Sequence, residues 1–101
     1  MKREQKIVRV TIKGRVQGVG YRAWTQMEAY RLEISGWVRN RFNGDVEAVF
    51  AGPADAVEAL CAACWHGPSQ SRVTKVLIED ASAEEYALTG ATSGFHQMPT
   101  R

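Results

Sequence analysis

The segment GRVQGVGYR, residues 14–22, holds the residues with the clearest potential for chemistry. Its glycines at positions 14, 18 and 20 let the backbone curl around a ligand, because glycine adopts positive φ and has no Cβ. A loop that leads into a helix exposes unpaired N–H groups beside the positive end of the helix dipole. Arg22, in the first helical turn, adds two parallel donors that match phosphate or carboxylate. The segment predicts an anion site, with phosphate the natural ligand. The alternative is that the glycines only form the turn and the arginines are solvated.

The segment differs from the common nucleotide-binding loops. Gly18-Val19-Gly20 is not followed by a glycine at position 23, and no GK[ST] follows. A formal net charge of +2, from 13 basic and 11 acidic residues, is too small for a general nucleic-acid or membrane binder. The N-terminal MKREQK lacks the apolar run of a signal peptide, and no segment approaches the roughly 20 apolar residues of a membrane span. We therefore expect a cytoplasmic protein without nucleic-acid or membrane partners.

The two cysteines, Cys61 and Cys64, allow a redox interpretation or a structural one. They fall at helical spacing with Val57 and Leu60, and small buried cysteines are common on such a stripe. A zinc site would also need the two histidines, which are 30 residues apart and lack paired ligand spacing. We expect buried cysteines and neither a metal nor another cofactor.

The anion loop lies between an expected strand and an expected helix. Residues 7–13 alternate, with Val8, Val10 and Ile12 on one face, which is typical of a half-buried strand. Residues 21–33 contain neither proline nor glycine and predict a helix. The apolar positions at helical spacing are Ala23, Met27, Tyr30 and Ile34, with Trp24 beside them.

The clearest turn signal lies in residues 36–52, where Asn43-Gly44 separates two β-prone runs. This pair favours a β-hairpin with a type I′ turn. Gly52-Pro53 ends the second strand, since proline is tolerated in a first helical turn. The remaining elements that we expect are a helix over 54–65, a strand over 73–80, a surface loop over 81–94 and a short last strand around Phe95.

The order β, α, β, β, α, β, with a possible fifth strand, predicts an α+β fold. Each helix has one apolar face, so both helices pack on one face of a largely antiparallel, four- to five-stranded sheet. Right-handed crossovers make this a ferredoxin-like sandwich. At 101 residues we expect a single domain spanning residues 1–101.

Motif content and motif order together resemble the acylphosphatase family over roughly residues 7–80. The matching segments are GRVQGVGYR, GWVRNRFNGDVE, GPADAVEAL and HGPSQSRV. The resemblance implies a small ferredoxin-like enzyme, a monomer, that hydrolyses small-molecule acyl phosphates to carboxylate and inorganic phosphate without a metal. The family arginine matches Arg22 and the family asparagine matches Asn40. The family's phosphate-binding backbone amides match Val16, Gln17, Gly18, Val19, Gly20 and Tyr21.

The chemistry that this resemblance implies is physically consistent. Carboxylate is a good leaving group, so an acyl phosphate needs little help from a general acid. Catalysis then consists of anchoring the phosphate oxygens and placing a water in line with the bond that breaks. Arg22 and the loop amides would anchor the phosphate. Asn40 would orient the water through its amide and leave proton acceptance to the phosphate or to solvent. Without the family match, Asn40 would more simply shape the end of the hairpin.

Each of three neighbouring residues, Arg39, Arg41 and Thr25, has two possible roles. Arg39 and Arg41 flank Asn40 and would raise the positive potential for an anionic substrate, or they are merely solubilising. Thr25 lies one turn after Arg22 and would support the water or the arginine, or it bonds its own helix backbone.

The C-terminal segment departs from the family pattern. The family commonly ends in an alternating apolar strand and a tyrosine, whereas this chain ends FHQMPTR. Phe95 and Met98 would point to opposite faces of a strand, and Pro99 cannot donate to a ladder. We expect an edge strand that is short or frayed.

Two other functions share this element order or this anion site. An RNA-recognition module would need basic and aromatic residues on the open face of its third strand. The acidic residues Asp45 and Glu47 argue against that platform, and an exposed Phe50 would favour it. The second alternative is a phosphate sensor, or a relative of the acylphosphatase-like domain of hydrogenase maturation factors, that binds without turnover. A water-orienting Asn40 favours the enzyme.

Overall fold

A computed structural model of the chain describes residues 4–87 and 94–101. The expected order of elements is confirmed, with one short helix added near the C-terminus. In chain order the elements are β1 (Gln5–Arg15), α1 (Tyr21–Arg31), β2 (Ser35–Asn40), β3 (Val46–Pro53), α2 (Ala54–Ala63), β4 (Arg72–Asp80), α3 (Ala83–Tyr86) and β5 (Phe95–Met98).

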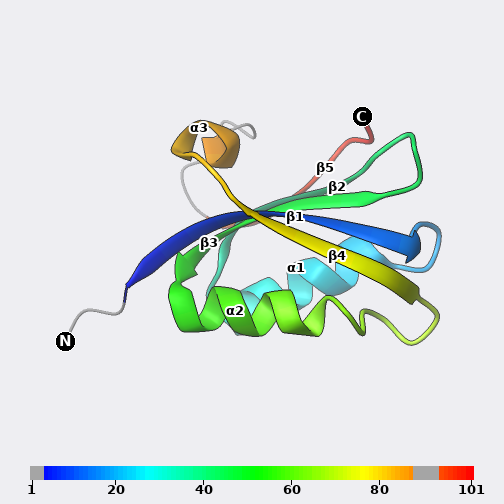
Figure 1. The fold of residues 1–101 in the computed structure, drawn as a ribbon, viewed down its shortest axis with the longest axis horizontal. Coiled ribbons are helices and arrows are strands. Elements are labelled where there is room, and N and C mark those ends of the chain that lie inside the picture. Colours follow the sequence, from blue (N-terminus) through cyan, green and yellow to red (C-terminus); the bar gives the residue numbers. More distant parts are fainter. Residues whose placement is uncertain (1–3, 88–93) are drawn as a thin grey trace.

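The five strands form one sheet in the order β4-β1-β3-β2-β5. All neighbours pair antiparallel except β2 and β5, which are parallel. Helices α1 and α2 lie on one side of the sheet and α3 lies on the other (Figure 1). This is the ferredoxin-like α+β sandwich that the sequence predicts, including the fifth strand.

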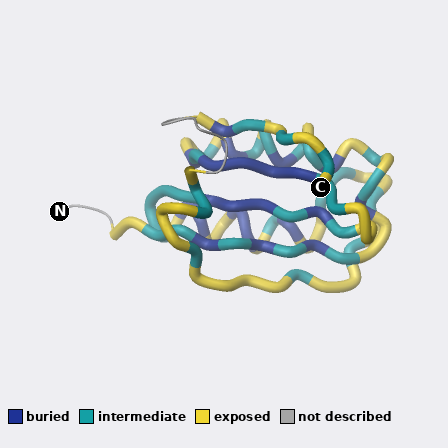
Figure 2. Tube along the Cα trace, turned by 90° about the horizontal axis from the view of Figure 1, so that it is seen from above, coloured by how far each residue is buried: buried dark blue, intermediate teal, exposed yellow. Residues whose placement is uncertain are grey.

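The core lies between the sheet and the two long helices. The alternating residues Val8, Val10 and Ile12 of β1 are buried in it, as the period of that strand predicts. Figure 2 shows that buried residues gather in the middle strands while one edge of the sheet is exposed. That edge is β4, in which Val76 packs against the core but Ile78 is 49% exposed.

The predicted buried face of α1 is wrong. Met27 and Tyr30 are 69% and 58% exposed, whereas Tyr21, Thr25 and Ala29 are buried. Tyr21 fixes the rotation of the helix, because its ring is buried and its hydroxyl donates to the carbonyl of Cys64 at 2.6 Å. The small side chains of Thr25 and Ala29 then face the sheet, where they allow close approach. Of the other predicted core positions, Ala23 is exposed, Trp24 is partly buried against the core and Ile34 is buried.

The predicted hairpin forms, but its turn is longer than a type I′ turn. Asn40 pairs with Val46, so five residues connect β2 to β3. A type I′ turn needs positive φ at both central residues, and among the described residues the only non-glycine with positive φ is Glu33. Asn43 instead accepts a hydrogen bond from the backbone N–H of Asp45 through its side-chain oxygen at 3.0 Å. Local side-chain bonding therefore replaces the tighter turn.

The loop expected over residues 81–94 contains the helix α3, which is a correction to the sequence prediction. Ser82 and Glu85 form a capping box: the serine hydroxyl accepts from the Glu85 N–H, and the Glu85 carboxylate accepts from the Ser82 N–H. A capping box satisfies the first N–H groups of so short a helix. The part of the expected loop over residues 88–93 lies outside the described residues.

The C-terminal strand is short, as predicted, and it is paired. Phe95 and His96 lie beside Gly36 and Trp37 in parallel register. The ring of Phe95 is fully buried and lies 6.0 Å from the Phe50 ring, centroid to centroid. Phe50 is likewise fully buried, so the exposed aromatic residue that an RNA platform needs on β3 is not present at this position.

Candidate active site

The glycine-rich loop, the β2–β3 turn and the C-terminus gather at one end of the sheet (Figure 1). The loop carries the chain from the end of β1 into the N-terminus of α1. Asn40 is the last residue of β2 and therefore lies at the same end. The topology thus brings together two sequence motifs that are separated by the whole of α1.

A cavity of about 160 Å³ lies between the loop, the start of α1 and the ends of β2 and β5. Six of the eight predicted site residues line it, including Arg22 and Asn40. The other two, Gln17 and Val19, are not among the lining residues. The full lining consists of Val16, Gly18, Gly20, Tyr21, Arg22, Ala23, Asn40 and Gln97.

Two glycines give the loop its concave shape. Gly18 and Gly20 have φ values of 75° and 81°, in the left-handed region that favours glycine. A Cβ on either residue would meet no other atom within 4 Å, so conformation rather than packing requires glycine there. Gly20 is also the N-cap of α1, and no side chain caps that end of the helix. The first N–H groups of α1 have no partner within the helix and lie beside the cavity, where they suit an anion.

Buried side chains hold the loop from behind. Val16 lines the cavity, is 1% exposed and belongs to the core, so its packing fixes this part of the loop. Thr25 donates its hydroxyl to the carbonyl of Tyr21 at 2.8 Å. Of the two roles open for Thr25, the helix-backbone bond is therefore the one observed. Burial, followed by the contact with Cys64, raises the pKa of Tyr21 far above its ordinary value, so this hydroxyl stays protonated as a donor.

Asn40 reaches the cavity because of its position in β2. Alternate residues of a strand face opposite sides of the sheet, so Asn40 shares the helix-covered face with the buried Val38. Its backbone is fixed from the C-terminal side. The N–H of Arg101 donates to the Asn40 carbonyl at 3.1 Å, and the Phe42 N–H donates to the Arg101 carbonyl at 3.1 Å.

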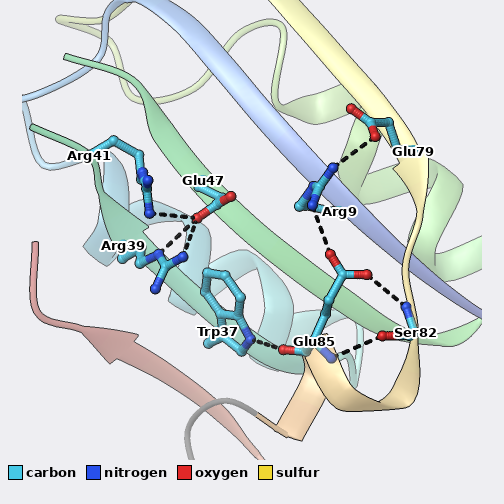
Figure 3. A network of polar contacts seen from close by, with 8 residues as sticks. All are labelled: Arg9, Trp37, Arg39, Arg41, Glu47, Glu79, Ser82 and Glu85. Carbon is cyan, nitrogen blue, oxygen red and sulfur yellow. Dashed lines mark hydrogen bonds and ion pairs between the residues drawn. The ribbon is translucent and has the colours of Figure 1, made fainter. Parts of the chain in front are cut away.

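The side chains of Arg39 and Arg41, which flank Asn40, point toward Glu47 and not toward the cavity. Arg39 lies on the opposite face of the sheet, where its guanidinium sits 4.8 Å from the centre of the Trp37 ring. Glu47 binds both Arg39, at 2.7 Å, and Arg41, at 3.5 Å (Figure 3). One carboxylate binds both guanidinium groups, so Glu47 neutralises one of the two positive charges. Arg39 is 8% exposed on the far face of the sheet, so it is neither a solubilising surface residue nor directed at the cavity.

Sequence reasoning missed Gln97 and Ala23 as cavity residues. Gln97 lies on β5 beside Val38, and its side-chain N–H₂ donates to the Gln26 side-chain oxygen at 2.9 Å. Gln26 in turn donates to the carbonyl of Phe95 at 2.8 Å. Only the parallel register of β5 with β2 places Gln97 near Asn40, and no local sequence signal encodes that register. Ala23 follows Arg22 directly in α1, so its place in the helix beside the predicted anion loop could have identified it.

The cysteines are free and buried, as predicted. With Val57 and Leu60 they form the apolar stripe of α2. Burial raises the pKa of Cys61 to about 11 and that of Cys64 to about 12. Neither thiol is therefore activated as a nucleophile at neutral pH.

Two other kinds of site are absent from residues 4–87 and 94–101. No three His, Cys, Asp or Glu side chains in these ranges are grouped so as to hold a metal ion. No helix there is both long enough and apolar enough to cross a membrane.

The fold and the cavity define a small ferredoxin-like α+β protein with a glycine-rich hollow at one end of its sheet. The family model described as Acylphosphatase matches residues 8–96. The chain belongs to the acylphosphatase family, a family of hydrolases.

Individual relatives agree with this assignment over most of their length. An acylphosphatase of Rhodopseudomonas palustris (strain BisB18) is 50% identical over 91 residues, which are 90% of this chain and 92% of the relative. The structure of an acylphosphatase from Coxiella burnetii has a TM-score of 0.83 at 34% identity and covers 93% of each chain. The crystal structure of acylphosphatase from Bacillus subtilis has a TM-score of 0.81 at 33% identity, covering 94% of this chain and 99% of that one.

Proposed function

We propose that this chain hydrolyses small-molecule acyl phosphates by in-line attack of a water on a phosphate held in the loop cavity. Arg22 and the backbone amides of residues 16–21 anchor the phosphate oxygens, and Asn40 orients the water. The observation that carries the proposal is the shared cavity, which joins Arg22, Asn40 and the two positive-φ glycines. The Arg22 guanidinium, the Asn40 amide and the N–H groups of the loop are the donors that phosphate anchoring and water placement need.

The mechanism needs little beyond position and charge. Binding places the phosphorus near the amides at the N-terminus of α1, where negative charge is favoured. The Asn40 amide holds the water on the side opposite the carboxylate leaving group, and attack forms the new P–O bond as the acyl P–O bond breaks. The proton of the water passes to a phosphate oxygen or to solvent, because an amide has no useful basicity. No step requires a metal or a nucleophilic side chain.

We also propose that residues 1–101 act as one domain and as a monomer. All five strands belong to one sheet. The loop, the start of α1 and the ends of β2 and β5 of one chain together line the cavity.

The activity is tested with purified protein and benzoyl phosphate, with and without a chelator. Release of inorganic phosphate above background in both conditions supports the metal-free enzyme. Saturable phosphate binding without turnover would instead identify a phosphate sensor and overturn the proposal.

The residue roles are tested by two substitutions with matched controls. Arg22→Ala is expected to abolish binding of substrate and of inorganic phosphate. Asn40→Ala is expected to leave phosphate binding nearly intact and to lower kcat by about 10²-fold or more, the scale for losing a positioned catalytic donor. The controls are Arg31→Ala, at the exposed end of the same helix, and Asn43→Ala, in the exposed turn. Full activity of Asn40→Ala would disprove the role given to Asn40.

A further inference from the structure

The proposed mechanism depends on a fixed distance between two separate parts of the chain. The loop before α1 anchors the phosphate, and the end of β2 carries the Asn40 that places the water. A displacement of about 1 Å between reacting groups can lower a rate by about 10²-fold. Some contact must therefore hold the loop and the end of β2 in register.

The side chain of Gln17 spans these two parts. Its Nε2 group donates to the carbonyl of Arg41 at 2.7 Å and to the carbonyl of Asp45 at 2.8 Å. The Arg41 N–H also donates to the Asp45 carbonyl at 2.8 Å. Gln17 thus closes the base of the β2–β3 turn from the loop side, immediately after Asn40. Only the N–H₂ end of the amide can donate to two carbonyls, so the Gln17 amide must be oriented with Nε2 toward them.

Two further contacts hold the same turn. The Lys13 ammonium lies 2.8 Å from the Asp45 carboxylate, whose side chain is 14% exposed. The backbone of Arg101 bonds Asn40 and Phe42 from the C-terminal side. These contacts tie the turn to β1 and to the C-terminus. Gln17 belongs to the loop itself, so its side chain ties the turn directly to the anion site.

We propose that Gln17 is a positioning residue, whose side chain sets the distance between the phosphate-binding loop and Asn40. This rests on the proposed function. The side chain of Gln17 does not line the cavity, so its effect on catalysis passes through the Asn40 segment. Its backbone amide remains part of the loop in any variant. The anchoring of phosphate and the placing of water are therefore separable by substitution at this one position.

The first experiment compares Gln17→Met and Gln17→Glu with the unmodified protein, using benzoyl phosphate as substrate and inorganic phosphate as inhibitor. Methionine has a similar length but no N–H donors, and glutamate has the same shape but turns a carboxylate toward two carbonyls. We expect kcat to fall by about 10-fold to 10²-fold in both variants, while the inhibition constant for phosphate changes by less than about threefold. Gln70→Glu, at an exposed glutamine before β4, is the control and is expected to keep the original kcat.

A double-mutant cycle with Asn40→Ala separates positioning from a purely structural role. If Gln17 acts through Asn40, adding Gln17→Met to Asn40→Ala lowers kcat by less than about twofold. If Gln17 only stabilises the fold, Gln17→Met leaves kcat unchanged at a temperature where every variant is folded. If Gln17 affects catalysis independently of Asn40, the effects of the two substitutions on kcat multiply. Either result would overturn the proposal. Thermal melts of each variant set an assay temperature at which all of them are folded.

The pH dependence of kcat in Gln17→Glu, measured where the variant is folded, gives a readout that fold stability does not explain. A protonated glutamate carries one O–H donor, so kcat of this variant should rise relative to the unmodified protein as pH falls. An unmodified protein without turnover would refute the proposed function. An active protein whose kcat is unchanged by Gln17→Met would refute only the role of Gln17.

Discussion

Replacing Tyr21 by phenylalanine removes a single buried oxygen that links the two long helices. The hydroxyl donates to the carbonyl of Cys64 at 2.6 Å, and Tyr21 is 2% exposed. Tyr21 is the first residue of α1, and Cys64 is the C-cap of α2. The bond therefore holds the start of α1, which lies beside the cavity, against the end of the neighbouring helix.

The cost of Tyr21→Phe follows from the burial of this bond. Without the Tyr21 hydroxyl, the buried Cys64 carbonyl loses this hydrogen bond and no water replaces it. The free energy of unfolding should therefore fall by about 1–3 kcal/mol. In a domain of roughly this size each kcal/mol lowers Tm by about 4–8 °C. We therefore expect a fall of at least about 4 °C, measured by calorimetry, and a lower urea midpoint with an unchanged m-value.

Tyr30→Phe is the matched control because it deletes the same atom at an exposed position. The Tyr30 hydroxyl donates to the carbonyl of Phe95 at 3.2 Å, and Tyr30 is 58% exposed. Water can replace this bond, so the free energy of unfolding should change by less than about 0.5 kcal/mol. Equal losses of stability in Tyr21→Phe and Tyr30→Phe would refute the reasoning from burial.

Two further predictions concern pH and the loop glycines. Folding raises the pKa of Cys61 from 9.0 to about 11 and that of Cys64 from 9.0 to about 12. Above about pH 9 the unfolded chain therefore loses thiol protons that the native state keeps. The free energy of unfolding consequently falls as pH rises. Urea melts between pH 7 and pH 10.5 check this, and a flat profile would contradict it. Gly18→Ala and Gly44→Ala both place alanine at positive φ with no atom within 4 Å, so each should cost about 1–2 kcal/mol of stability. Only Gly18 lines the cavity, so calorimetric titration should show weaker phosphate binding in Gly18→Ala alone; equal affinities would refute this.

The electrostatics of the site are local, which agrees with the small net charge of +2. Arg9 forms ion pairs with Glu79 and Glu85 at 2.8 Å each, on the same side of the sheet as the Arg39–Glu47 pair (Figure 3). The side of the sheet away from α1 and α2 therefore carries compensated charges. In the proposed mechanism, attraction for an anion at the cavity depends on Arg22 and on backbone amides.

The sequence determined the fold and most of the candidate site because these depend on local patterns. Alternation in β1 identified its buried face, and the glycines at positions 18 and 20 identified a loop that requires positive φ. The order of motifs, through its resemblance to the acylphosphatase family, was sufficient to name Arg22 and Asn40 together. Local chemistry also encodes the capping box of Ser82 and Glu85, a signal that the sequence prediction overlooked.

Tertiary structure decided what depends on contacts between distant residues. The rotation of α1 follows from the bond of Tyr21 to Cys64 and not from the apolar spacing within the helix. The presence of Gln97 in the cavity follows from the parallel pairing of β5 with β2, and the bridge from Gln17 to Asp45 follows from the meeting of a loop and a turn. Helical and strand periodicities describe one element at a time, so contacts between elements emerge only when the chain packs.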